Sequence, residues 1–102
     1  MRKKPRRLPP VHPGEVLHED LMKPLGVSIN RLARELRVPV NRMSEIVNGR
    51  RGITADTALR LARYFATTPE FWMNLQAAFD LDSAQRVSAD RIARDVNPRE
   101  AA

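Results

Sequence analysis

The sequence predicts an all-α protein, and two observations support that prediction. Apolar residues recur at intervals of three and four, whereas the strict alternation of a half-buried strand is missing. Serine or threonine precedes several of these apolar stripes, as helix N-caps do. A chain of 102 residues without cysteine has room for one helical domain and no disulfide framework.

The two ends of the chain differ from its middle. Residues 1–11 are basic and proline-rich, so we expect a disordered arm there, ahead of a folded domain over residues 12–82. Residues 83–102 are polar with a weak helical pattern, which predicts a C-terminal extension that is either a short docked helix or a frayed tail. The basic start lacks the apolar run of a secretory signal, and no stretch approaches a membrane span. We therefore expect a cytoplasmic protein.

The first of five expected helices runs from about Pro13 to Met22. Proline suits the first helical position, and leucines follow at helical spacing. Lys23-Pro24-Leu25-Gly26 is expected to end this helix, because the residue before a proline avoids the helical region.

The second and third helices are expected to meet at Arg37-Val38-Pro39. Ser28 is a natural N-cap, and one apolar face follows it as far as Leu36. The third helix then runs to Asn48, where Gly49 provides a stop. Such a pair has the shape of a helix-turn-helix, whose second helix fits a DNA major groove. Any small helical bundle contains a similar pair, so a purely structural interpretation stays open.

Thr54 is expected to cap the fourth helix, and Thr68 and Pro69 to begin the fifth. The apolar residues of the fifth helix spread too widely to be buried against one neighbour, which favours an interface. We expect them to be divided between the core and a dimer contact, with burial of the whole set as the alternative. The set is Phe71, Trp72, Leu75 and Phe79.

Positive charge gathers in the N-terminal segment and in the middle of the chain. The formal net charge is +6, and Arg50 and Arg51 directly follow the predicted helix stop. A basic block within a folded segment favours a polyanionic partner, although a solvated helix face is the alternative.

Three blocks of sequence occur in order: HPGEVL at 12–17, PVNRMSEIVNGRRGITADTA at 39–58 and PEFWMNLQ at 69–76. Together they resemble the XRE (lambda-repressor-like) helix-turn-helix family and, within it, the HigA branch of antitoxins. The resemblance implies a five-helix domain that forms a homodimer, represses its own operon and neutralises a RelE-like toxin that cleaves mRNA. A two-fold dimer would bind double-stranded DNA at an inverted-repeat operator.

The resemblance places the DNA-reading surface on the third helix. Asn41 is expected to bond an adenine edge, and Val40 to meet a thymine methyl. Glu45 either accepts a hydrogen bond from a cytosine or, as we favour, pairs with Arg42. The implied base-reading residues are Val40, Asn41, Arg42, Ser44 and Glu45, and the implied phosphate contacts are Ser28, the Ile29 amide, Arg42, Arg50, Arg51 and the Gly52 amide.

The sequence departs from the family at Arg37 and Ala66, where glycine is usual. A left-handed backbone costs a non-glycine residue on the order of 1 kcal/mol. We therefore expect the turn at Arg37 to be tightened in a different way.

Neither a metal site, a cofactor nor catalysis is expected. His12 and His18 lack a third ligand, and His12 is better suited to fixing the start of the first helix. The acidic residues lack a nucleophile or histidine partner on a shared face. Two other functions remain open: a repressor of the same fold without a toxin, and an RNA-binding protein that uses the basic arm. The chain lacks the aromatic stacking sheet that would favour RNA.

Overall fold

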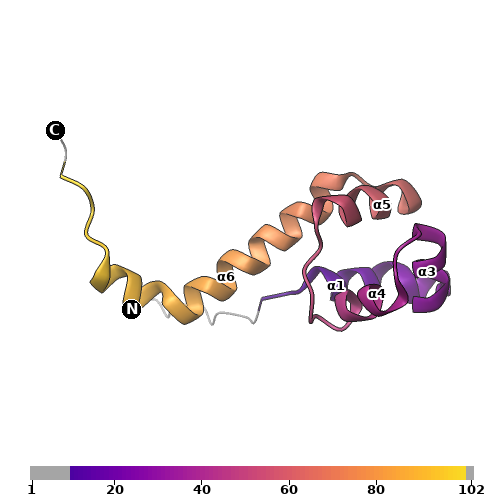
Figure 1. The fold of residues 1–102 in the computed structure, drawn as a ribbon, viewed down its shortest axis with the longest axis horizontal. Coiled ribbons are helices and arrows are strands. Elements are labelled where there is room, and N and C mark those ends of the chain that lie inside the picture. The colour runs from indigo at the N-terminus through magenta and orange to yellow at the C-terminus, as the bar shows by residue number, and fades with distance from the viewer. Residues whose placement is uncertain (1–9, 101–102) are drawn as a thin grey trace, which may run out of the picture.

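The computed structural model describes residues 10–100 and confirms the all-α class, because those residues form helices and no strand. Residues 1–9 of the expected arm lie outside this range, and residues 10–12 are non-helical. Figure 1 shows a body of short helices from which one long helix projects. The elements are α1 (Pro13–Val16), η1 (Leu17–Met22), α2 (Lys23–Leu25), α3 (Ile29–Leu36), α4 (Val40–Val47), α5 (Ala55–Phe65) and α6 (Pro69–Asp95).

The prediction that the first helix ends before Pro24 is wrong, since α1, η1 and α2 follow one another without a break. The middle element is π-helical, and the Lys23 N–H donates to the His18 carbonyl five residues earlier. A proline lacks an N–H and its ring opposes the carbonyl four residues earlier, so the wider turn accommodates Pro24. Gly26, in the left-handed region with φ 67°, ends the segment.

The turn between α3 and α4 also differs from expectation. Arg37 itself occupies the left-handed region, with φ 62° and ψ 43°, and Ala66 does the same after α5 with φ 57°. The Val38 N–H donates to the Ala33 carbonyl at 3.0 Å, which closes the end of α3. Val38 is buried, so its packing offsets the cost of the backbone conformation.

The core lies where α1, α3, α4, α5 and the start of α6 converge. Gly14 permits the closest approach, because a Cβ built there would lie 1.8 Å from the Ile46 carbonyl oxygen of α4. Any larger residue would therefore push α1 away from α4. The buried apolar residues are Leu17, Met22, Leu32, Ala33, Leu36, Val38, Met43, Ile46, Ile53, Ala58, Leu61, Ala62 and Trp72.

Residues 83–95 continue α6 and form neither a separate short helix nor a frayed tail. No proline or glycine occurs between Glu70 and Val96, and residues with good helix propensity predominate. Pro98 follows shortly after the helix ends at Asp95. No helix within residues 10–100 is both long enough and apolar enough to span a membrane.

Candidate nucleic-acid interface

The exposed face of α4 is the candidate reading surface. Met43 and Ile46 are almost fully buried and fix the inner side of this helix. Val40 is 47% exposed, and Asn41 beside it is also exposed, so the first turn lies open. The Asn41 Oδ1 accepts a hydrogen bond from the Arg42 N–H at 3.0 Å. An apolar and an amide side chain thus stand together at the start of α4.

The two polar residues that follow are less open than the first turn. Arg42 is half-buried, and no described residue pairs with its guanidinium. Ser44 is half-buried as well, and its Oγ accepts from Asn48 Nδ2 at 3.3 Å. The Asn48 amide also donates to the Ser44 carbonyl at 2.8 Å. Ser44 is therefore engaged with the end of its own helix.

The favoured pairing of Glu45 with Arg42 is wrong. The carboxylate of Glu45 accepts from Arg51 Nε at 2.7 Å, across the stop that follows α4. The Arg50 N–H donates to the Glu45 carbonyl at 2.8 Å. Because the chain turns back at Gly49, with φ 75°, Arg51 comes within reach where Arg42 does not. Glu45 therefore orients the loop after α4.

The remaining predicted phosphate contacts lie at a helix start and in the loop. The Ser28 Oγ accepts from the Arg31 N–H at 3.1 Å, as an N-cap does. The Ile29 amide belongs to the first turn of α3, where backbone donors lack partners within the helix. Arg50 is exposed, and Gly52 is half-buried. These positions supply one cationic side chain, Arg50, and two backbone donors, the Ile29 and Gly52 amides.

Gln76, which sequence reasoning missed, fixes the loop from the side of α6. Its Oε1 accepts from the Ile53 N–H at 2.7 Å, and its Nε2 donates to Asp80 Oδ1 at 2.9 Å. A Cβ added at Gly52 would lie 3.0 Å from the same amide nitrogen. The only available signal was the position of Gln76 next to Leu75, at the end of the block over residues 69–76. The long helix therefore positions the residues that follow α4.

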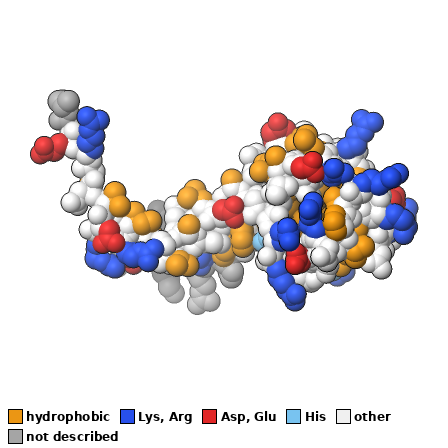
Figure 2. Space-filling model, in the orientation of Figure 1, with side chains coloured by type: hydrophobic (Ala, Val, Ile, Leu, Met, Phe, Trp, Pro, Cys, Tyr) orange, Lys and Arg blue, Asp and Glu red, His pale blue; other side chains and the backbone are white. Residues whose placement is uncertain are grey.

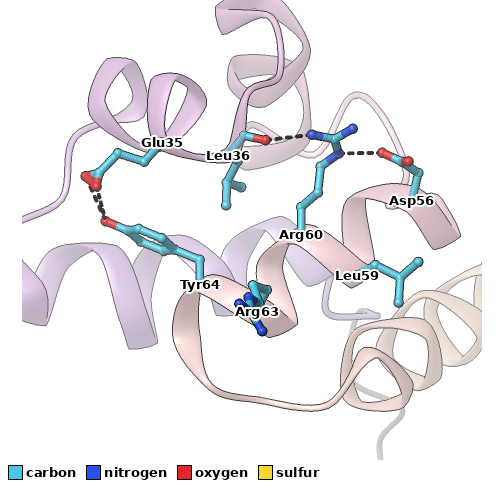
Figure 3. Close-up of a pocket in the computed structure, with 7 residues that line it drawn as sticks. All are labelled: Glu35, Leu36, Asp56, Leu59, Arg60, Arg63 and Tyr64. Atoms are coloured by element: carbon cyan, nitrogen blue, oxygen red, sulfur yellow. Dashed lines mark hydrogen bonds and ion pairs between the residues drawn. The ribbon is translucent and has the colours of Figure 1, made fainter.

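Figure 3 shows a pocket between α3 and α5 whose polar side chains are mostly engaged with one another. Arg60 donates to the Leu36 carbonyl at 2.9 Å and pairs with Asp56 at 2.6 Å. The Tyr64 hydroxyl donates to the Glu35 carboxylate at 3.0 Å. These bonds attach α5 to the end of α3. The residues that line the pocket therefore stabilise the packing of these two helices.

His12 fixes the start of α1, as the sequence predicts. The Gly14 N–H donates to His12 Nδ1 at 2.9 Å, and the ring meets Phe79 of α6 edge to face at 4.8 Å. Burial lowers the pKa of the His12 ring from its ordinary value and outweighs the opposing effects of the Arg51 backbone and the Asp80 carboxylate. The neutral ring is the form that can accept from Gly14.

Acidification is expected to destabilise the protein through His12. Because the folded state lowers this pKa, the stabilisation is complete above about pH 6.5 and is lost as the pH falls through the folded value. Denaturant unfolding between about pH 5 and 7.5 measures it. His12→Asn, which caps without titrating, should remove this pH dependence, whereas the control His18→Gln should keep it. A His12→Asn variant with the wild-type pH profile would contradict the assignment.

The structure divides the apolar set predicted for a dimer contact. Trp72 is fully buried, and its Nε1–H donates to Thr67 Oγ1 at 2.8 Å, so its inclusion in an interface is corrected: it is a core residue. Leu75 packs against the same core, and Phe79 packs on His12. Phe71 is 41% exposed and is the member with the most surface for a partner.

The arrangement as a whole defines a helix-turn-helix protein of the DNA-binding class, which is a regulatory rather than an enzymatic class. The short helices α3 and α4 meet at a tight turn in which the backbone of Arg37 is in the left-handed region. The exposed first turn of α4 lies in the same segment as the loop that carries Arg50 and Arg51. Within residues 10–100 no three metal-ligating side chains form a cluster.

Comparison with known proteins agrees with the assignment to the helix-turn-helix class. The helix-turn-helix family model matches residues 19–72. Antitoxin HigA-1 of Vibrio cholerae is 43% identical over 82 residues, which cover 79% of this chain and 74% of that protein. An addiction module antidote protein of the HigA family from Coxiella burnetii has a TM-score of 0.84 at 51% identity, covering 90% of this chain and all of the other.

A further structure is the Pseudomonas aeruginosa antitoxin HigA, solved with the higBA promoter. Its TM-score is 0.86 at 40% identity, and the match covers 89% of this chain and 99% of the other. The chain therefore belongs to the XRE-type helix-turn-helix family, in its HigA branch of antitoxins.

Proposed function

We propose that this protein represses its own operon by binding operator DNA and neutralises a RelE-like toxin that cleaves mRNA. The observation that carries the proposal is the open first turn of α4, set in a fold that matches an antitoxin solved with a promoter over 89% of this chain. Such a protein acts in the cytoplasm, where its operon lies.

The proposed base readers lie in the first turns of α4. Asn41 bonds an adenine edge, which requires its side chain to leave the Arg42 amide, and Val40 covers a thymine methyl. Arg42 lies between base edges and the phosphates. Ser44 and Glu45 lie farther along the helix, and their local bonds give them a positioning role in this proposal.

The proposed phosphate contacts surround α4 on both sides. Ser28 and the Ile29 amide face one backbone segment, while Arg50, Arg51 and the Gly52 amide face another. Contacts of this kind fix the register of a protein on the duplex without reading its sequence. The ion pair with Glu45 holds Arg51 in place before DNA arrives.

Replacing Arg50 and Arg51 together by alanine should weaken binding to every duplex alike. Each lost phosphate contact lowers the salt dependence of log K by about 0.9, so the slope should flatten by up to about 1.8. Titrations of own-promoter DNA and random DNA at several salt concentrations measure the slope. Arg63→Ala on α5, another exposed arginine, should leave it unchanged. An unaltered slope in the double variant would show that these arginines do not face phosphates.

Specific binding also requires two copies of the chain. One helix-turn-helix reads too few base pairs to single out an operator, so a homodimer at an inverted repeat is part of the proposal. Half-sites are then expected about 34 Å apart, which is one turn of duplex.

Copurification tests the toxin partner. We expect a tag on this chain to recover a small RelE-like protein encoded by the adjacent gene, and coexpression to relieve that protein's toxicity. If no adjacent product binds while operator binding persists, the chain is a repressor without a toxin. Preference for RNA over duplex DNA in a competition assay would instead support an RNA-binding protein.

A further inference from the structure

The positive charge of this protein is concentrated at its N-terminus. Residues 1–9, which we call the basic arm, carry five of the eighteen basic side chains and none of the twelve acidic ones. The rest of the chain holds thirteen basic against twelve acidic side chains, so its formal net charge is +1 rather than +6. The basic residues of the arm are Arg2, Lys3, Lys4, Arg6 and Arg7.

Several of the remaining basic side chains are paired with acids. Ion pairs join Lys23 to Glu19, Arg31 to Glu35, Arg51 to Glu45, Arg60 to Asp56 and Arg86 to Asp82. Figure 2 shows basic and acidic side chains interspersed on the face that it draws. Affinity for duplex DNA depends largely on cations that neutralise phosphates. The basic arm therefore holds most of the net charge that this protein can offer to such a partner.

The structure shows where the basic arm joins the domain. Pro10 and His12 line one groove together with residues 47–49, which form the end of α4 and its stop. A Cβ built on Gly49 would lie 3.8 Å from Cγ of His12, so the two segments are in contact. Figure 1 shows the described chain entering the body at α1, next to α4. The residue after Gly49 is Arg50, a proposed phosphate contact, so the arm begins beside the loop that faces DNA.

The shape of a duplex indicates what lies next to this loop. A helix in the major groove is bordered by phosphate backbones, and contacts around it hold the protein to them. The minor groove, about 6 Å wide, lies on the other side of each backbone. A chain spans at most about 3.6 Å per residue, which allows Arg7 to reach about 18 Å from His12 and Arg2 about 36 Å. The arm is therefore long enough to cross the backbone and enter the minor groove.

We propose that the basic arm binds the minor groove beside the half-site that α4 reads. The negative potential of a narrow minor groove attracts arginine and lysine side chains, and arms of this kind need no rigid fold to enter it. The inference rests on the proposed function and adds to it a second DNA contact, made by residues that the helix-turn-helix does not contain. The arm raises affinity for every duplex, whereas Asn41 discriminates between sequences.

The salt dependence of binding to random duplex DNA provides the first test. The arm variant combines Arg2→Gln, Arg6→Gln and Arg7→Gln in the full-length chain. At about 0.9 per lost contact, the slope of log K against log salt should flatten by up to about 2.7, with binding weaker by about tenfold or more at 0.1 M salt. Lysine at the same three positions keeps the charge and should retain the slope. A change smaller than one contact in the glutamine variant would overturn the proposal.

A second triple variant controls for net charge. Arg63→Gln, Arg94→Gln and Arg99→Gln remove three exposed arginines that lie outside the arm and the α4 loop. This variant has the same net charge as the arm variant, but its slope should change by less than about 0.9. Equal flattening in both variants would mean that total charge, rather than the arm, determines the affinity, and would overturn the proposal.

Hydroxyl-radical footprinting of own-promoter DNA tests the groove, because this probe attacks the sugars from the minor groove. The wild-type chain should protect the minor groove next to each half-site, and the arm variant should lose that protection. Guanine N7 methylation, which reports the major groove, should remain protected in both proteins. Minor-groove protection that persists in the arm variant would overturn the placement of the arm.

The same variants separate this proposal from its alternatives. If the arm variant keeps the duplex slope but loses single-stranded RNA or the copurified toxin, the arm binds that partner and the proposal is wrong. The slope measurement needs only random DNA, so it judges the arm even if no operator is found. Asn41→Ala judges operator reading with the arm intact, so the two failures are distinguishable.

Discussion

Replacing Trp72 by alanine is expected to lower the free energy of unfolding by about 3–5 kcal/mol. The ring is fully buried at the start of α6, meets Phe71 edge to face at 4.9 Å and donates to Thr67 at 2.8 Å. Removal leaves a cavity where α6 joins the body, and Thr67 loses its partner. Chemical denaturation followed by circular dichroism measures the loss.

Two related variants keep the Trp72 experiment informative. Trp72→Phe retains most of the ring and loses the indole hydrogen bond, so a smaller loss is expected. Phe71→Ala removes the neighbouring aromatic, which is 41% exposed, and should also cost less than Trp72→Ala. A Trp72→Ala variant as stable as Phe71→Ala would contradict the placement of Trp72 in the core.

Replacing Asn41 by alanine is expected to weaken operator binding by about 1–3 kcal/mol, or about five- to 150-fold, while binding to random DNA stays nearly unchanged. The reason is that a bidentate contact to adenine is lost only where the sequence offers that adenine. Competition titrations with own-promoter and random duplexes measure both affinities.

Asn74→Ala is the matched control for Asn41, since it removes an exposed asparagine from α6. It should leave both affinities unaltered. Equal losses on the two DNAs in Asn41→Ala would mean that this residue touches the backbone and does not read a base.

The helix starts could be predicted from sequence because their determinants are local. Ser28, Thr54 and Thr68 each accept a backbone N–H three residues later, as N-caps do. The end of the first helix could not, because the local rule for proline was overridden by the π-helical turn of η1. An isolated dipeptide preference is weaker than the packing of Leu17 and Met22 in the core.

The candidate site was predictable as a segment but not as a set of contacts. The open turn of α4 follows from the pattern of its apolar residues. The partner of Glu45 depends on how the chain turns at Gly49, and the contact from Gln76 to Ile53 joins residues far apart in sequence. Such contacts depend on tertiary packing that spacing along one helix does not encode.

The likeness to HigA antitoxins supplied the function class, and the structure corrected the placement of Trp72, which lies in the core. Spacing alone could not tell Trp72 from an interface residue, because core and interface aromatics share the same helical periodicity. The exposed half of α6 became visible only once the helix proved to continue past residue 82 to Asp95.

Footprinting of the DNA upstream of this protein's own gene tests the central proposal most directly. We expect protection of an inverted repeat whose two half-sites are centred about ten base pairs apart, on one face of the duplex, and loss of that protection in Asn41→Ala. Uniform coverage without sequence preference, or protection that Asn41→Ala leaves intact, would contradict a repressor that reads its operator with the first turn of α4.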